Sequence, residues 1–390
     1  MMTTTVPAWF ADLQDEARAE YDTHPMPSRR DETWRFGNLK QLDFGGYTPD
    51  EGSEIRFSIP ELPDGVICVP FEEALEKHSD LVQKYFMRNE PRLGSQKFAA
   101  LHKANVKNGL FVYVPDNVQV EKPIEVSHVL KGSNKMTFPH TLVVTGKNAQ
   151  VSVLDRFSSA NDDDANICIA VNDLIAGEGS RLTYCAIQEL NLVSRMIQIN
   201  ETSVGKDATA KAFTMNSGAQ WARNEALSIL EGEGAHSDML SCSIPSGTQQ
   251  FDQRTFQHHA APHTNSDLLY KNSLYGNAKT VFSGLILVDE GAHYTDAYQT
   301  CRNLMMDDTA EANSMPGLEI NADQVKCSHG STSATISDEE IFYLRARGIP
   351  PHKARRLIAR GFSAEAVEKL GNEALEDAVL EAVERKFSTL

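Results

Sequence analysis

A cysteine and a histidine stand two residues apart near the C-terminal end of the chain, in the segment VKCSHGSTSATISDEEIFYLRARGIP. If Cys327 and His329 lie on a β-strand, their side chains point to the same face. A thiolate beside an imidazole suits soft or borderline metals, including iron held in clusters. Val325 would share that face, and this apolar neighbour favours a buried structural pair over a metal site on the pattern alone.

The other reactive side chains form weaker patterns. His258, His259 and His263 could bind a metal, but their spacing brings two ligands together only on a helix, and the segment is typical of strand and turn. The acidic run at 162–164 is typical of a solvated loop. No two of the six cysteines form a CxxC pair, so we expect reduced thiols that are mostly buried.

Several catalytic and nucleotide-binding motifs are absent from the sequence. It has no GxxxxGK[ST], so ATP binding by a P-loop is excluded. The Gly232-Glu233-Gly234 turn lacks the rest of a dinucleotide fingerprint. The sequence also contains no HExxH, GxSxG or zinc-ribbon spacing. The common hydrolase and nucleotide-binding classes are therefore not indicated.

The charge balance argues against nucleic acids and anionic membranes as partners. The 390 residues hold 37 Lys and Arg against 54 Asp and Glu, a net charge of −17. Such a chain repels polyanions. No run of 18 apolar residues is present, so no membrane span is expected. The stretch from Met1 to Trp9 has neither a basic start nor an apolar core, so we expect no secretory signal and a cytoplasmic location.

The chain contains three regions with different residue patterns, and we take these regions as domains. Residues 1–109 are predicted to be mainly helical, 110–336 to be β-structure, and 337–390 to be helical again. In the first region the apolar spacing predicts a helix over Pro7 to Thr23. A short helix around Asp31 to Leu42, an irregular stretch over Gly45 to Asp64, and helical segments at 71–75 and 91–108 follow.

The middle region repeats with a period near 28 residues. Small residues follow polar breaks at intervals of 31, 28, 27 and 26. They are Ala149, Ser180, Ala208, Ala235 and Ala261. This spacing predicts a coil of two strands and two turns stacked on its neighbours, with roughly eight coils forming a rod of ~40 Å. A β-sandwich or barrel is the alternative, but hairpin signals are sparse.

Helix signals return after Ile336. Ser337 and Glu340 form a predicted capping box, and Gly348 is placed to end the helix that follows. A second helix is predicted to end at Gly361. A third is predicted to start with a cap at Ser363 and to run to about residue 387.

Three tracts resemble the SufB/SufD family, scaffold subunits of the Suf iron–sulfur cluster assembly machine. The segment from Val325 to Ile349 is similar to the family's C-terminal signature. ETWRFGNLK and KFAALHKANVKNGLFVYVPDNVQVEKPIEV are similar to its N-terminal segment and to its entry into the β-region. The resemblance spans about Asp31 to Gly361 and implies a mainly β fold, a parallel β-helix core flanked by N-terminal and C-terminal α-helical domains. CSHGST and the chain length resemble the SufD type.

The resemblance also implies a non-catalytic role and a set of partners. It assigns His329, and more weakly Cys327, to a transient iron–sulfur cluster built at the interface with a SufB-type subunit. No cluster is expected to stay tightly bound to the isolated chain, which could form a homodimer when alone. Tyr298-Gln299-Thr300-Cys301 resembles the SufB tract that holds a cluster-building cysteine, so Cys301 is either a ligand or a small strand residue. A flavin is associated with the family, but these residues do not indicate one.

A basic tract follows the CSHG signature and contains no acid between its first and last members. Its members are Arg345, Arg347, Lys353, Arg355, Arg356 and Arg360. Removing these six charges from −17 leaves the rest of the chain at −23. The tract is either a solvated helical face or, as the resemblance suggests, an electrostatic docking face for SufC, an ABC-type ATPase.

Two rival functions remain on sequence grounds. A β-solenoid enzyme acting on carbohydrate would line a groove with paired carboxylates and aromatic platforms, yet Trp221 is the only tryptophan in the repeat region. A purely structural homodimer would need no ligand residue at all.

Overall fold

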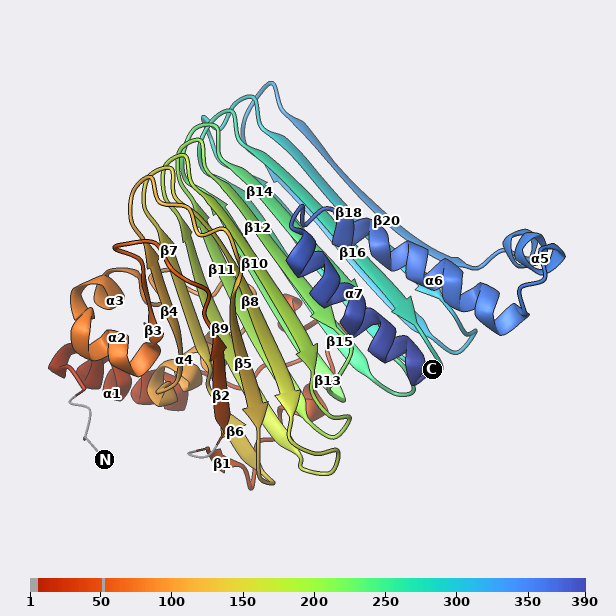
Figure 1. Ribbon diagram of the computed structural model, residues 1–390, viewed down its shortest axis with the longest axis horizontal. Coiled ribbons are helices and arrows are strands. Elements are labelled where there is room, and N and C mark those ends of the chain that lie inside the picture. Colours follow the sequence, from red (N-terminus) through yellow and green to blue (C-terminus); the bar gives the residue numbers. More distant parts are fainter. Residues whose placement is uncertain (1–5, 51–52) are drawn as a thin grey trace.

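A computed structural model describes residues 6–50 and 53–390 of the chain. A rod of stacked strands forms its middle, and the colours of Figure 1 advance along the rod from N-terminal helices to C-terminal helices. The strands of the rod pair in parallel and alternate between two sheets. The predicted parallel β-helix flanked by helices is therefore confirmed.

The N-terminal region mixes short helices and strands. It contains α1 (Ala8–Thr23), η1 (Glu32–Trp34), η2 (Leu39–Leu42), β1 (Thr48–Pro49), β2 (Glu54–Ser58), β3 (Ile67–Pro70), α2 (Phe71–Lys77), α3 (Ser79–Tyr85) and α4 (Gln96–Asn105). The helix predicted over Asp31 to Leu42 is wrong: two 3₁₀ turns replace it. Phe36 between them adopts a left-handed φ of 62°, which an α-helix does not accept.

The rod is built from two sheets that face each other. One holds β4 (Gly109–Val114), β6 (Lys135–Thr137), β7 (His140–Thr145), β9 (Asn166–Ala176), β11 (Arg195–Val204), β13 (Trp221–Leu230), β15 (Gln250–His259), β17 (Lys279–Val288) and β19 (Glu311–Ile320). The other holds β5 (Ile124–Leu130), β8 (Gln150–Ser159), β10 (Arg181–Glu189), β12 (Thr209–Asn216), β14 (His236–Ser243), β16 (Asn265–Leu274), β18 (Asp296–Met305) and β20 (Lys326–Thr335). Odd-numbered and even-numbered strands thus separate almost completely.

The sequence repeat marks one corner of successive coils. A residue with left-handed backbone conformation recurs there, at Asn148, Gly179, Asp207, Gly234 and His263. Ala149, Ser180, Ala208 and Ala235 follow the first four of these positions directly and are buried, because the chain turns inward at that point. In the next coil the equivalent buried residue is Thr264, so the interval predicted to end at Ala261 is wrong by three residues.

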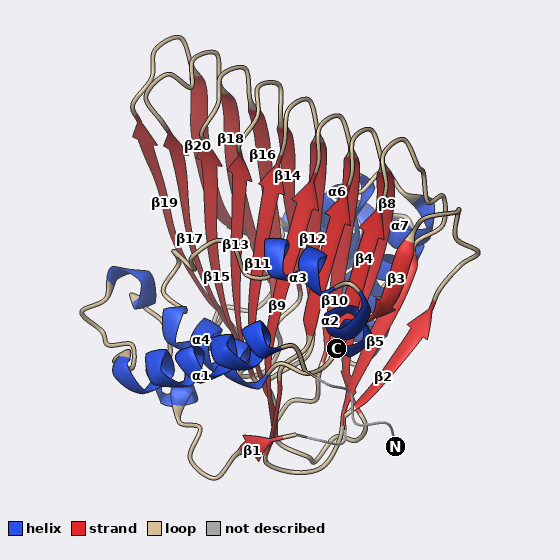
Figure 2. Ribbon diagram, turned by 90° about the vertical axis from the view of Figure 1, so that its left-hand side faces the viewer, coloured by secondary structure: helices blue, strands red, loops and turns tan. Residues whose placement is uncertain are grey.

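Side chains inside the rod and on its outer faces form separate cores. The lumen of the first coils is apolar, with residues such as Val112, Val153 and Leu182 packed together. The N-terminal region covers the outer face of the first sheet, where Trp34 and Phe98 meet its strands. Figure 2 shows these helices lying across that sheet.

Three helices follow the rod, α5 (Asp338–Ala346), α6 (Pro351–Glu368) and α7 (Glu373–Ser388). The last two of them, α6 and α7, cover the outer face of the second sheet. The predicted capping box of Ser337 and Glu340 is present, and Gly348 follows α5 with φ 84°. The predicted end of the second helix at Gly361 is wrong, because α6 continues through it.

Two local contacts explain the longer α6 and the later start of α7. A Cβ atom built on Gly361 would contact no other atom. This glycine therefore lies on the exposed face of α6, where the helix can continue through it. Ser363 donates its hydroxyl to the Ala359 carbonyl at 3.0 Å and does not act as a cap. The cap of α7 is Asn372, whose side chain accepts a bond from the Leu375 amide at 3.2 Å.

A buried charge network holds the N-terminal region on the first sheet. Arg223 pairs with Glu225 and Asp252, at 2.6 Å each, and its guanidinium lies 3.7 Å from the ring centre of Trp34. It also donates to the Thr33 carbonyl at 3.0 Å. Leaving a buried charge without its partners costs free energy, so these contacts are hard to break. Arg223 therefore fixes the ETWRFGNLK tract to the solenoid.

One carboxyl group beside this network is not paired with a cation. Glu201 is buried next to Asp173, its neighbour in strand register, and its Oε2 atom has no hydrogen-bond partner among the described residues. Burial above all, and then the neighbouring Asp173 and Glu225, raise the pKa of Glu201 to about 9, while Lys103 and Arg92 act in the opposite direction. The folded chain therefore holds a proton on Glu201 that the unfolded chain releases.

Glu201→Gln should stabilise the protein under mildly alkaline conditions. The folding free energy gained by binding this proton is fully present below pH 4.5, the ordinary pKa of glutamate. It is lost as the pH rises towards about 9. The variant should melt at a higher temperature than wild type at pH 8 and nearly the same temperature at pH 4.5. Glu178→Gln, on the surface, serves as control. If the melting temperature of Glu201→Gln fell with rising pH as much as that of wild type, Glu201 would not be the group responsible.

Candidate functional site

The rod is closed at its N-terminal end and open at its C-terminal end. At the first coil, β2 and β3 add antiparallel to β5 and β4, and Leu62 and Val66, in the segment between them, pack against the core of the lumen. At the other end, β19 pairs only with β17, and β20 only with β18, among the described strands. Figure 2 shows β19 at the free edge of its sheet. This open end carries the strand that holds Cys327 and His329.

Strand register places both of these residues on the inner side of the last coil. Cys327 lies beside Ala297, and His329 beside Gln299, on the neighbouring strand β18. Since Ala297 and Gln299 are buried in the lumen, their partners on β20 face the same way. His329 is nevertheless exposed, because no further coil covers it. An imidazole thus stands at the mouth of the lumen.

Cys327 is half-buried beside this imidazole. It packs against an apolar cluster that includes Ile286, Val288 and Ala292. Burial is the main cause that raises the pKa of the Cys327 thiol, and Asp296 adds to it. The pattern-based expectation of a core contact is therefore met for the cysteine but not for the histidine.

Cys301 lies one strand deeper and is fully buried. Its strand neighbour is Ser331 rather than His329, so two residues along the strand separate it from the histidine. Burial raises the pKa of the Cys301 thiol to about 12. The Asn272 amide contacts its sulfur at 3.8 Å. Standard strand spacing puts the Cα atoms of Cys301 and His329 ~8 Å apart.

The open end does not contain a complete metal site. Across residues 6–50 and 53–390, no three histidine, cysteine or acidic side chains are close enough to hold a metal ion. A thiol must lose its proton to bind iron, and both thiols here are held protonated. The chain can therefore offer an imidazole at once, but thiolates only if iron or a rearrangement displaces their protons.

The other histidines considered from sequence have separate partners. His258 contacts Asp289 at 2.8 Å, and His259 contacts Thr264 at 2.7 Å. His263 stacks on Tyr294 with ring centres 4.8 Å apart. The three side chains do not converge.

The residues of the basic tract lie on or beside two helices, α5 and α6, and fall into two groups according to their contacts. Arg356 and Arg360 both pair with Glu384 of α7, at 3.2 and 2.7 Å. Arg355 donates to the Met306 carbonyl. These three arginines hold α6 in place, which sequence alone did not reveal.

The remaining basic residues lie on a more open surface. Arg347 lies 4.4 Å from the ring centre of Tyr343. Arg345 and Lys353 are exposed and form no ion pair with any described residue. They are thus available to an acidic partner, whereas the inner arginines are already engaged.

Helix α5 carries an aromatic surface that the sequence analysis missed. None of its residues is buried, and Figure 1 shows it projecting from α6 away from the sheets. Phe342 is 70% exposed and Tyr343 is 57% exposed. Leu357 on α6 is 45% exposed. Adjacent aromatics in a well-capped, charged helix were the available signal, since such residues seldom face water without a partner.

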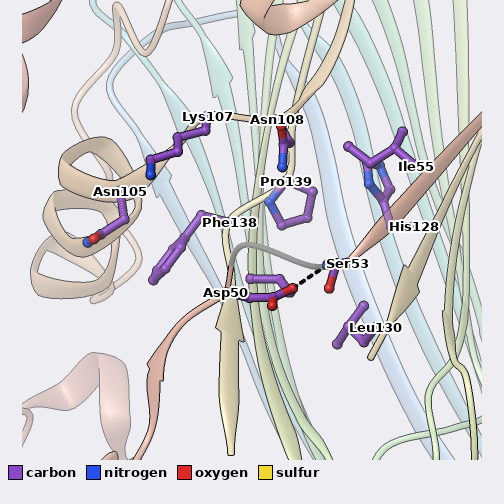
Figure 3. A pocket seen from close by; sticks show the side chains of 11 residues that line it. Asp50, Ser53, Ile55, Asn105, Lys107, Asn108, His128, Leu130, Phe138 and Pro139 are labelled. Atoms are coloured by element: carbon purple, nitrogen blue, oxygen red, sulfur yellow. Dashed lines mark hydrogen bonds between the residues drawn. The ribbon is translucent and has the colours of Figure 1, made fainter. Parts of the chain in front are cut away.

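A separate small pocket, with a cavity volume of about 40 Å³, lies between the N-terminal region and the first coil (Figure 3). His128 on its wall lies 3.1 Å from the buried Asp155. Asp155 also accepts bonds from Thr141 at 2.8 Å and Tyr184 at 3.0 Å. These groups fix one another in the lumen. The pocket contains none of the residues singled out from sequence.

Comparison with known proteins decides between the families that could build such a rod. The family model described as "SUF system FeS cluster assembly, SufBD core domain" matches residues 128–362. A second model, "SufBD protein N-terminal region", matches residues 50–126. The chain belongs to the SufBD family. The resemblance seen in the three sequence tracts is therefore confirmed.

Curated relatives agree over nearly the whole length. "Iron-sulfur cluster assembly protein SufD" of Bacillus subtilis is 28% identical, covering 97% of this chain and 94% of its own. The protein of the same name from Escherichia coli is 27% identical over 93% and 89%. "Iron-sulfur cluster assembly SufBD family protein slr0076" of Synechocystis is 27% identical over 92% and 87%. No helix among residues 6–50 and 53–390 is both long and apolar enough to cross a membrane.

The two cysteines of the open end should differ in reactivity. In the isolated native chain at pH 8, iodoacetamide should modify Cys327 several-fold faster than Cys301, because burial restricts both access to Cys301 and its ionisation. Timed alkylation followed by peptide mass spectrometry measures both rates. The unfolded chain, in which the rates should converge, is the control. Equal rates in the folded protein would show that Cys301 is more accessible than its surroundings indicate.

Proposed function

We propose that the chain is a SufD-like scaffold subunit of an iron–sulfur cluster assembly complex. It would join a SufB-type partner through the open end of its β-helix and present His329 to the cluster being built there. The observation that carries the proposal is an exposed imidazole at the one end of the lumen where the described strands stop without a cover. The family membership and the SufD relatives support the same role.

The backbone of the last coil supports a joint made by strand pairing. The outer edges of β19 and β20 carry amide and carbonyl groups that no described strand satisfies. An exposed edge of this kind accepts a strand from another chain. A partner with its own open β-helix end would extend both sheets and cover the lumen. A second copy of this chain is the alternative occupant, which corresponds to the homodimer considered from sequence.

Ligation at this joint would follow from the chemistry of its side chains. The nascent cluster is the cargo of the complex, and an imidazole such as that of His329 is a common ligand of iron. Cys327, two residues away, would have to lose its proton as iron binds. Cys301 would also need access, because the last coil covers it. The partner chain would supply the remaining ligands. Cluster retention should therefore weaken at low pH.

The outer surface of α5 supports docking of an ATPase subunit of the SufC type. Exposed Phe342 and Tyr343 provide apolar area, and Arg345, Arg347 and Lys353 provide positive charge. Aromatic residues combined with arginine are the usual composition of binding hot spots. ATP hydrolysis in the docked subunit could then move α5 and α6 relative to the rod and open the joint to iron and sulfur.

The carbohydrate-enzyme alternative finds little support in the positions of the acidic residues. Asp173 and Glu201 are a pair of neighbouring carboxyl groups, but both are buried beneath the N-terminal region. They cannot reach a polymer in a groove. The relatives are assembly proteins, and no enzyme activity is indicated. The cytoplasmic location stays a prediction.

His329→Ala should separate complex formation from cluster formation. When the variant is co-expressed with SufB-type and SufC-type subunits, the complex should purify normally but hold several-fold less iron and sulfide. The reason is that the mutation removes a ligand from an exposed edge and no core contact. Ser328→Ala, on the outer side of the same strand, is the matched control. Wild-type iron content in His329→Ala would support the purely structural homodimer instead.

Arg345→Glu combined with Phe342→Ala should greatly reduce co-purification with the SufC-type subunit. Both side chains are exposed on a helix without buried residues, so the double variant should melt like wild type. Arg18→Glu on α1, far from α5 along the rod, should leave the complex intact. Recovery of SufC in wild-type amount with the double variant would exclude this surface as the docking site.

A further inference from the structure

The lumen of the last coils contains a ladder of hydrogen-bonded polar side chains. Gln253 donates to Asn272 at 3.1 Å, and Asn272 donates to Asn303 at 2.9 Å. Asn303 then donates to Ser333 at 3.2 Å. The first step crosses the lumen from β15 to β16, the next two pass from coil to coil along the second sheet, and Ser333 lies on β20 at the open end. The ladder therefore points at the joint proposed above.

Further polar groups lie in the lumen near the open end, outside the ladder. Gln299 is 1% exposed, and its Oε1 atom has no hydrogen-bond partner among the described residues. The Ser314 hydroxyl on β19 is also buried, and it lies beside the Cys301 thiol. Ser331 and Ser333 are exposed beside them. Buried polar groups without partners are rare in folded proteins, so this cluster is typical of a surface that another chain completes.

The opposite half of the mouth is apolar. Leu318 and Ile320, near the end of β19, are 37% and 40% exposed. Val325 and Cys327, near the start of β20, are half-buried against the apolar cluster that includes Ile286. The two strands are joined directly by the turn between them, so these four residues lie at the same side of the lumen.

We propose that this division of the mouth sets the register of the joint between the two chains. The inference rests on the proposed pairing with a SufB-type partner. The partner it fits is a chain with an open β-helix end whose inward side chains are hydroxyls or amides opposite Ser331 and Ser333, and apolar opposite Leu318 and Ile320. His329 lies between the two halves.

The physical reason is that backbone pairing alone does not select a register. Every shift by two residues restores the same backbone hydrogen bonds and the same inward face. Side chains must distinguish these registers. A shifted partner would place apolar groups over the exposed Ser331 and Ser333 and leave their hydroxyl hydrogens buried without acceptors, which weakens binding roughly 5- to 100-fold for each such group.

Register matters because the cluster requires exact ligand positions. A shift by two residues moves one strand ~6.7 Å along the other. A bond from imidazole to a metal is only ~2.1 Å long. A shifted partner would therefore hold its ligands out of reach of His329. The ladder is thus a positioning device for the cluster, separate from the ligands themselves.

Substitution of the last ladder residue tests the inference in the full complex. Ser333→Val introduces a β-branched side chain with the shape of threonine but without a hydroxyl, so it removes the hydrogen bonds of this position. It should weaken binding of the SufB-type chain about tenfold or more and lower the iron content of the complex that remains. Ser333→Thr, which retains the hydroxyl, should restore both. Thr332→Val on the outer side of the same strand is the control for general effects on the edge.

The outcomes separate this inference from the function on which it rests. If wild type and all three variants bind the partner with the same affinity and hold the same iron, the ladder does not set the register. If wild type itself fails to bind a SufB-type chain, the proposed function fails, and the register inference fails with it. Melting temperature should be unchanged in Ser333→Val, because Ser333 is exposed in the isolated chain.

Discussion

A stack of parallel strands satisfies the backbone of each coil only through the coils above and below it. The first and last coils must therefore be closed by something else. In this protein the first coil is closed by antiparallel strands β2 and β3 and by the segment between them, while the buried Arg223 network holds the N-terminal region in place. The last coil has no such cover among the described residues. The unequal treatment of the two ends explains why the candidate site lies where it does.

The lumen changes character between those two ends. Near the closed end it is filled by aliphatic side chains, which suits a permanent core. Near the open end amides and hydroxyls replace them, and the hydrogen bonds pass from coil to coil until they reach β20. Hydrogen bonds between polar groups contribute little net stability, but a polar group that becomes buried requires a hydrogen-bond partner in the surface that covers it. A protein that must join another chain in one register has reason to use them at the joint.

The C-terminal helices combine a fixed part with a free part. Helix α6 is held on the second sheet by Lys271, which is buried and pairs with Glu365, and by the arginines that contact Glu384 and Met306. Helix α5 has no buried residue. A partner bound to α5 could thus transmit a displacement through α6 to the strands beside it, including β16, which α6 contacts directly.

Much of this protein was determined by its sequence alone. The repeat of small buried residues predicted stacked coils, because every coil must turn at the same corner with similar backbone geometry, and CSHG with the flanking tracts indicated the family. Local capping residues also located the start of α5. Tertiary structure decided the rest. His329 is exposed and Cys301 buried only because β20 is the last strand. The inner arginines contact Glu384 and Met306 only because α6 packs against both α7 and the second sheet. The burial and the long-range contacts of these residues depend on which helices and strands pack together, and a local sequence pattern does not contain that information.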